Sequence, residues 1–211
     1  MTVEVGLRER KKQQTRAKIM DAALNLFAAR GFDDVRVSEI ARLAEVSEAT
    51  IFNYFPTKED LVYQGMGTYE DALIAAIRDR PTGTPILTAA REFVVQRRGA
   101  LATADPAALA RVATMARLIA GSAALRTREQ QIIDRATTEL AQLIAAEQVP
   151  EVLAYTSANA LLGISRALTR EVHRLALAGR TGADIAAHML AEGARAFDLL
   201  EDGLGEFAPG R

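Results

Sequence analysis

Apolar residues recur along most of the chain at intervals of three and four positions rather than alternating with polar residues. This spacing places the apolar side chains on one face of a helix and is typical of amphipathic α-helices. The first helix is predicted over residues 8–30, with a glycine stop at Gly31. Its apolar stripe consists of Ile19, Ala22, Ala23, Leu26 and Phe27. The pattern therefore predicts an all-α fold.

Two short helices are predicted next, separated by a tight turn. The first covers about residues 37–44, and the second begins after Ser47, a good N-cap, and runs to about residue 54. Only Glu45 and Val46 lie between them. A long helix followed by two such short helices is the helix-turn-helix geometry, in which the second short helix enters the major groove of DNA. The residues expected to be buried in the first short helix are Ile40, Leu43 and Ala44.

Capping and helix-breaking residues predict the remaining helices. Thr57 and Asp60 have the spacing of a capping box and open a helix from Lys58 to about Arg80. The stretch 80–85, rich in Pro, Gly and Thr, is the clearest linker. Further amphipathic segments are predicted over residues 85–103, 106–120, 123–146, 150–178 and 181–200.

Charge is distributed unevenly along the chain. The net charge is −1, from 26 basic and 27 acidic residues, so any contact with DNA must be local. Residues 1–18 hold six basic and two acidic residues, whereas residues 19–61 hold four basic and eight acidic residues. We therefore expect the basic N-terminal arm to add phosphate or minor-groove contacts.

Composition excludes several classes of protein. The chain has no cysteine, which removes disulfide scaffolds and thiolate metal sites. The longest run without a charged side chain, residues 152–165, has 14 residues, short of the roughly 18 that a membrane span needs. No apolar leader follows the first methionine. We expect a cytoplasmic protein that does not contact a membrane.

The stretch from Ile19 to Leu61 resembles the DNA-binding domain of the TetR family of transcriptional regulators. The motifs that carry the resemblance are, in order, Ala-Leu-Asn-Leu-Phe, Arg-Gly-Phe, Ser-Glu-Ile-Ala, Ala-Glu-Val-Ser-Glu-Ala-Thr-Ile-Phe-Asn-Tyr-Phe and Pro-Thr-Lys-Glu-Asp-Leu. The resemblance implies three N-terminal helices for DNA binding, residues 1–57, and six for ligand binding and dimerisation, residues 58–211. It also implies a regulator rather than an enzyme, most often a repressor, with a pseudo-palindromic DNA operator, a small effector and a second copy of the chain as partners. No cofactor is expected.

Candidate DNA contacts lie on or beside the second short helix. Asn53 can pair bidentately with an adenine edge, and the methyl group of Thr50 suits a thymine methyl. Tyr54 and Lys58 stand where the family usually contacts the DNA backbone and would hold phosphate. A solvated helix residue remains the alternative for Asn53. The full set is Arg36, Ser47, Glu48, Ala49, Thr50, Phe52, Asn53, Tyr54 and Lys58.

Two of these positions depart from the commoner family pattern. Arg36 stands where Thr or Ser usually caps the first short helix; it cannot cap in that way but can reach a phosphate. Glu48 occupies a position that is often basic or neutral. It is well placed in the first turn of its helix, and it could instead accept a hydrogen bond from a cytosine amino group.

The C-terminal part offers weaker signals. Residues 117–140 and 167–170 are similar to the C-terminal domains of family members assigned acyl-CoA-like ligands, so an apolar or acyl-type effector is expected. The candidate ligand-binding residues are Tyr69, Phe93, Met115, Tyr155, Asn159 and Arg166, with ordinary core packing as the alternative for each. The residues expected to pair with a second copy are Leu161, Leu162, Ile164, Ala167 and Leu168 on one helix and Ile185, Met189, Ala196, Phe197 and Leu200 on the next.

A helical-bundle enzyme, or a small-molecule-binding protein without a DNA function, is the alternative. The chain lacks Glu-x-x-His, a Walker loop, Gly-x-Gly-x-x-Gly and Gly-x-Ser-x-Gly. Asp184, His188 and Glu192 share one helix face and could hold a metal. A solvated helix face explains that row better, so no metal site is predicted.

Overall fold

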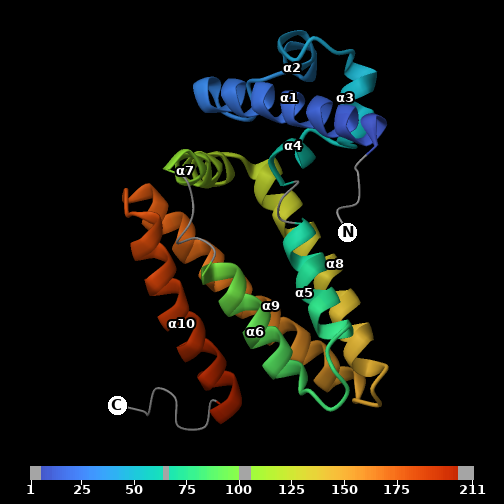
Figure 1. Cartoon of the computed structure of the whole chain (residues 1–211), viewed down its shortest axis with the longest axis vertical. Helices are drawn as coiled ribbons and strands as arrows, with labels where there is room; N and C mark the ends of the chain where they lie inside the picture. The colour runs from blue at the N-terminus through green and yellow to red at the C-terminus, as the bar shows by residue number, and fades with distance from the viewer. Residues whose placement is uncertain (1–5, 64–66, 100–105, 204–211) are drawn as a thin grey trace. The chain divides into compact units, whose positions relative to one another are not determined.

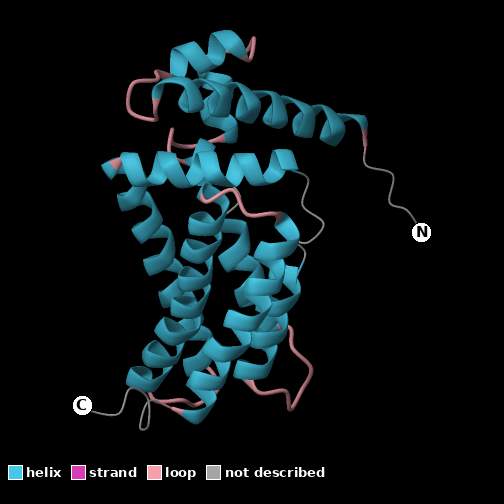
Figure 2. Ribbon diagram, turned by 90° about the vertical axis from the view of Figure 1, so that its left-hand side faces the viewer, coloured by secondary structure: helices cyan, strands magenta, loops and turns pink. Residues whose placement is uncertain are grey.

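The described residues, 6–63, 67–99 and 106–203 of a computed structural model, form ten helices and no strand (Figures 1 and 2). The all-α prediction is confirmed. Packing divides the chain into two compact units. Unit 1 comprises Met1–Gly65 and Arg117–Arg128, and unit 2 comprises Met66–Ala116 and Glu129–Arg211. The predicted boundary after residue 57 stays a prediction.

Unit 1 contains the predicted helix-turn-helix. Its helices are α1 (Leu7–Arg30), α2 (Val37–Leu43), α3 (Glu48–Tyr54) and α4 (Asp60–Tyr63), joined by the end of α7 (Pro106–Gly121) and the start of α8 (Ala123–Ala145). Helix α1 packs against α2 and α4, and α2 packs against α3 (Figure 1). The largest fully buried side chains of this core are Ile19, Phe27, Ile40, Ile51, Phe55, Leu61, Tyr63 and Leu125.

The apolar pattern predicted this core well, with one error. Leu43 was expected to be buried but is 51% exposed. It is the last residue of α2, and the next residue, Ala44, occupies the core position with no exposed surface. Val46, in the turn after α2, is half-buried.

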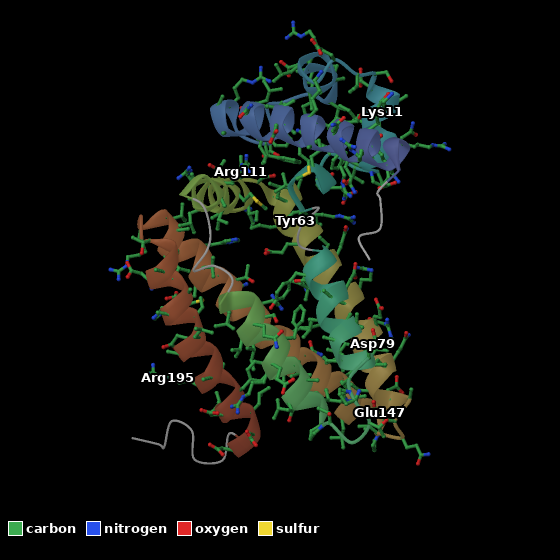
Figure 3. All side chains as sticks on the ribbon, viewed as in Figure 1. Lys11, Tyr63, Asp79, Arg111, Glu147 and Arg195 are labelled. Carbon is green, nitrogen blue, oxygen red and sulfur yellow. The ribbon has the colours of Figure 1, made fainter. Side chains whose placement is uncertain are left out.

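Among the side chains of α1 that the structure describes, which start at Arg8, the first buried one is Ile19. The basic residues before it are exposed. Lys11, labelled in Figure 3, belongs to this stretch. Most of the predicted basic arm is thus the start of α1, while residues 1–5 lie outside the described part of the chain.

Unit 2 is built from longer helices. They are α5 (Gly67–Arg78), α6 (Ile86–Gly99), most of α7 and α8, α9 (Glu151–Leu177) and α10 (Gly182–Asp202). Helix α6 packs against α5, α9 and α10, and α10 packs against α9. Their shared core is led by Leu73, Ile74, Ile77, Leu140, Ile144, Leu162, Ile185, Met189 and Phe197.

The segment expected to be a single helix from Lys58 to Arg80 is described as two helices. Helix α4 belongs to unit 1 and α5 to unit 2, and residues 64–66 lie outside the described residues. The expected helix end near Thr103 and the start at Asp105 also fall outside them.

Among the described residues, no single helix is both long and apolar enough to cross a membrane. Only α7 and α8, broken at Ser122, reach that length and composition as a pair.

Candidate DNA-binding site

The start of α2 is fixed by Glu39. Its carboxylate accepts a hydrogen bond from the backbone N–H of Arg36 at 2.9 Å, which satisfies a donor at the helix N-terminus. The guanidinium of Arg30, in the last turn of α1, donates to both Glu39 oxygens at 2.9 and 2.7 Å. These bonds, Arg30 first, lower the pKa of Glu39 to about 2. One carboxylate therefore caps α2 and ties it to α1.

The turn between α2 and α3 contains a left-handed residue that is not glycine. Glu45 has φ +51°, and its carboxylate forms an ion pair with Lys18 of α1. The backbone N–H of Val46 donates to the carbonyl of Ala41 at 3.0 Å, which closes the end of α2. The sequence predicted this turn by its length, but not the backbone conformation at Glu45.

Helix α3 begins as predicted. The Ser47 hydroxyl accepts a hydrogen bond from the backbone N–H of Thr50 at 3.0 Å, so Ser47 is the N-cap. It also lies 2.8 Å from the Thr50 hydroxyl. Thr50 is half-buried, so its side chain contacts the Ser47 cap and is also partly accessible at the helix surface.

The side chains of α3 divide into a buried and an exposed face. Ile51 and the following Phe55 are fully buried and hold the helix against the domain. The exposed residues are Ser47, Glu48, Ala49, Phe52 and Asn53, with Tyr54 half-buried beside them. Phe52 is 45% exposed. Most of the predicted base-reading set therefore lies on one accessible face, which we call the reading face: Ser47, Glu48, Ala49, Phe52 and Asn53.

Arg36 and Lys58, both predicted to contact phosphate, have different surroundings. Arg36 is exposed, and the helix cap at this point is made by its backbone N–H rather than by its side chain. The ammonium of Lys58 donates to the backbone carbonyl of Phe32 at 2.6 Å and lies 4.2 Å from the centre of the Phe32 ring and 5.8 Å from that of Phe27. Burial lowers its pKa. The phosphate role of Lys58 stays a prediction, but the side chain also has partners inside its own domain.

Three contacts that the sequence did not predict join the α7–α8 corner to the rest of unit 1. The buried Tyr63 hydroxyl donates to the carbonyl of Leu125 at 2.8 Å. The Ser122 hydroxyl donates to Asp33 at 2.8 Å, and the Arg128 guanidinium donates to Asp60 at 2.7 Å. The partners are between 62 and 89 residues apart, so no local pattern signals these pairs.

The predicted ligand-binding residues lie in several places within unit 2. The rings of Tyr69 and Phe93 are in contact, with centroids 5.4 Å apart. Tyr155 and Asn159 lie in a shallow depression on the surface of α9. Arg166 lines a small polar pocket with Glu70 and other residues, and Met115 is half-buried on α7. Their assignment to one ligand site stays a prediction.

The possible metal row on α10 is divided among other partners. His188 Nε2 lies 2.9 Å from a carboxylate oxygen of Glu171 on α9. Glu192 pairs with Arg195 at 2.7 Å, and Asp184 lies 3.6 Å from Arg180. Within the described ranges, no group of three or more acidic or histidine side chains is arranged to hold a metal ion.

The residues expected to pair with a second copy are mostly used inside one chain, which corrects the expected interface. Ile185, Met189 and Phe197 of α10 have at most 1% of their surface exposed. On α9, the side chains of Leu161, Leu162, Ile164 and Leu168 are buried as well, and only Ala167 of the predicted set is exposed. Periodicity located the apolar faces, but those faces pack within unit 2. The outward side of α10 instead carries Ala183, Ala187, Leu190, Ala191 and Ala194, which we call the alanine face, beside the exposed Asp184, His188 and Arg195.

Comparison with known proteins identifies the class. A family model described as bacterial regulatory proteins, tetR family, matches residues 19–64, which include α2, α3 and α4. The HTH-type transcriptional regulator TcmR of Streptomyces glaucescens is 37% identical over 78 residues, 37% of this chain and 34% of TcmR. The regulator LuxR of Vibrio harveyi is 51% identical over 53 residues, 25% of this chain and 24% of LuxR. The matched segment thus spans about a third or less of these relatives.

Solved structures extend the likeness to the whole fold. NalD, the secondary repressor of the MexAB-OprM multidrug efflux pump in Pseudomonas aeruginosa, aligns with a TM-score of 0.56 at 19% identity, over 87% of this chain and 97% of NalD. FadR of Thermus thermophilus, a TetR-family repressor solved with lauroyl-CoA, aligns with a TM-score of 0.53 at 22% identity, over 93% of this chain and 100% of FadR. At such identities the likeness concerns the fold alone.

Residues 19–64 therefore match the N-terminal domain of the TetR family of transcriptional regulators. The matched family and relatives are regulators, which agrees with the prediction that the chain is not an enzyme.

Proposed function

We propose that this protein is a transcriptional regulator that acts in the bacterial cytoplasm and represses its target by binding a pseudo-palindromic operator. The observation that carries the proposal is the reading face of α3, which is accessible and includes the polar residues Ser47, Glu48 and Asn53, while Ile51 on the opposite face of the same helix is fully buried. A helix held in this way presents side chains to base edges without moving the domain core. Asn53 supplies the amide suited to adenine, and Arg36 and the exposed basic side chains of α1 supply phosphate contacts.

The regulator binds DNA as a homodimer in this proposal. A single seven-residue reading helix buries too little surface to be selective, so two reading faces are needed. The alanine face supports such pairing, because small side chains at helical spacing allow two helices to approach closely. Leu190, 38% exposed, lies within that face.

Release by a small apolar or acyl-type effector completes the proposal. The FadR structure holds lauroyl-CoA in a chain of similar fold, which supports an acyl-type ligand without showing one here. A route for coupling exists in the chain itself, because α7 and α8 contribute residues to both units. A ligand that displaces either helix in unit 2 therefore acts on the contacts of Ser122, Leu125 and Arg128 in unit 1.

Footprinting on DNA upstream of the protein's own gene tests the operator. Two protected half-sites about one helical turn apart are expected. Asn53→Ala should weaken operator binding by roughly 1–3 kcal/mol if the contact is bidentate, with the loss confined to one base pair in each half-site. Protection of an asymmetric site by a monomer would overturn the proposal.

Reciprocal titration tests release. Linkage requires that operator DNA weaken effector binding by the same factor by which the effector weakens operator binding, expected within about 5–150-fold. Equal effector affinity with and without operator would refute the coupling.

A further inference from the structure

One cavity in unit 2 is lined by none of the predicted ligand-binding residues, although it shares Thr156 with the depression that holds Tyr155 and Asn159. It has a volume of about 370 Å³ and is formed where the first turns of α6 and α9 meet the last turns of α8 and α10, at the end of unit 2 that carries Glu147 in Figure 3 (Figures 1 and 3). Ligand pockets range upward from about 300 Å³, so this volume suits a small molecule rather than a large one.

The cavity lining is apolar with one polar edge. Its walls come from Ile86, Leu87, Ile144, Val149, Leu161 and Leu200. Thr156 and Ser157 of α9 supply the polar edge, and Ala160 lies one turn further along the same helix. Thr156 donates its hydroxyl hydrogen to the carbonyl of Val152 at 2.7 Å, which leaves its oxygen able to accept from a ligand. Neither an acidic nor a basic side chain belongs to the lining.

Ion pairs on either side hold the walls in place. Arg80 donates to the carbonyls of Ile77 and Thr84 and to the carboxylate of Glu147, at 2.6 to 2.8 Å, and so ties the segment before α6 to the end of α8. Arg91 of α6 pairs with Asp198 of α10 and lies 3.7 Å from Glu201. These contacts tie together the helix ends that bound the cavity.

We propose that this cavity binds a neutral, mainly aliphatic molecule of medium chain length with one hydrogen-bonding group, such as an alcohol or a ketone. The apolar walls take the chain, and the Thr156 and Ser157 hydroxyls take the polar group. Thr156 and Ser157 are solvent-exposed, and none of the described residues that line the cavity is basic, so a carboxylate or phosphate in this position would have no counter-charge, which favours a neutral ligand. The claim that the cavity binds the effector rests on the proposed function. The claim that it binds a ligand of this kind does not.

The probes are 1-octanol and octanoate, which share a chain length and differ in charge at neutral pH. Calorimetric titration of the full-length protein without DNA should give saturable binding of 1-octanol at one site per chain. Octanoate should bind at least tenfold more weakly. Equal affinity for the two probes, or no saturable binding of 1-octanol, would overturn the proposal.

Variants locate the site. Ala160→Leu fills the cavity and should weaken 1-octanol binding more than tenfold, whereas Ala146→Leu places the same side chain on the exposed turn after α8 and should leave binding unchanged. Unchanged binding by a folded Ala160→Leu protein would contradict the location. The near-isosteric pair Thr156→Val and Ser157→Ala keeps the cavity shape, and it should weaken 1-octanol binding about threefold to tenfold. If the double variant binds 1-octanol as tightly as the wild type, the two hydroxyls play no part in binding.

Operator binding is measured separately in the same samples. If 1-octanol binds and operator occupancy does not change, the ligand site stands and the release step of the proposed function fails. If the protein binds no operator at all, the proposed function fails, while the calorimetric result still decides the ligand site.

Discussion

The two units use their side chains in different ways. In unit 1, single side chains fix backbone positions: Glu39 caps α2 and Lys58 bonds to the Phe32 carbonyl. In unit 2, long helices share a broad core of Leu, Ile, Ala and Val, and their ion pairs lie mainly on the surface. An apolar core tolerates exchange of side chains when volume and pattern are kept, whereas a capping or turn residue does not. We therefore expect function that depends on exact placement in unit 1, and the proposed ligand binding, which is more adaptable, in unit 2.

The comparisons follow the same division. Identity reaches 51% over 53 residues in LuxR, whereas identity over nearly the whole chain is 22% in FadR. The family model likewise ends at residue 64, one residue before the first segment of unit 1 ends. The following substitutions test the division, from the largest expected effect to the smallest.

The largest effect is expected at the alanine face of unit 2. Ala187→Arg places a charge on it and should convert the proposed dimer to a monomer, because an unpaired charge in an apolar interface is costly. Operator affinity should then fall toward the non-specific level, by about 10³-fold or more. Sedimentation measures the oligomeric state and gel-shift titration measures the operator affinity, with Ala146→Arg as the control. A dimeric Ala187→Arg protein with full operator affinity would show that the face does not join two copies.

A smaller effect separates the two basic residues near the DNA. Lys58→Met removes a charged hydrogen bond and a cation–π contact, so unfolding by urea should become easier by about 1–3 kcal/mol. Arg36→Met, at an exposed position, should change stability by less than about 0.5 kcal/mol and still weaken operator binding. If Lys58→Met leaves stability unchanged, its contact with Phe32 contributes nothing and the lysine acts on DNA alone.

Acid should weaken the ion pairs of Glu39 in unit 1 and Glu171 in unit 2 alike. Both carboxyl groups have their pKa lowered from 4.5 to about 2, Glu39 chiefly by Arg30 and Glu171 chiefly by Arg174. Each therefore contributes stability that is fully present above about pH 4.5 and is lost as the pH falls toward 2. Because the two pKa values are lowered equally, Glu39→Gln and Glu171→Gln should each flatten the fall in denaturation midpoint between pH 6 and 3, and by similar amounts. A variant that keeps the wild-type fall would show that its carboxyl group adds nothing to the pH dependence.

The smallest effect is expected at the two left-handed residues that are not glycine. Glu45 in unit 1 has φ +51° and Gln148 in unit 2 has φ +65°. Glycine removes a steric cost of about 1 kcal/mol at such positions, and at Glu45 it also removes an exposed ion pair worth at most about that much. Gln148→Gly should therefore stabilise the protein by about 0.5–1 kcal/mol, and Glu45→Gly by less. Melting curves of both variants, with Glu45→Ala as the control that keeps the strain, provide the measurement. If Glu45→Gly stabilises the protein more than Gln148→Gly does, the ion pair between Glu45 and Lys18 contributes no stability.

Local signals predicted the helix-turn-helix because its rules are local. The cap at Ser47 and the buried positions Ile40, Ile51 and Phe55 depend on neighbours three or four residues away. The helix periodicity also located the apolar faces of α9 and α10. It could not show which partner those faces meet, and Met189 and Phe197 are buried within their own chain.

Features that depend on distant contacts were beyond prediction. The bond from Tyr63 to Leu125 joins residues 62 positions apart, and the cavity beside Ala160 gathers the ends of four helices. Polar or aromatic residues on apolar faces, such as Tyr155 and Arg166, gave no information on whether they meet in space. Composition alone also could not show that Lys58 bonds within its domain.

The central claim is that the exposed face of α3, presented twice by a dimer, reads a two-fold symmetric DNA sequence. Selection of bound sequences from a random duplex library tests it most directly, with the wild-type protein and Asn53→Ala selected in parallel. The account predicts that the wild type enriches a pseudo-palindrome and that Asn53→Ala enriches the same palindrome with one base pair relaxed in each half-site. Enrichment of an asymmetric sequence, or identical preferences for both proteins at every position, would contradict it.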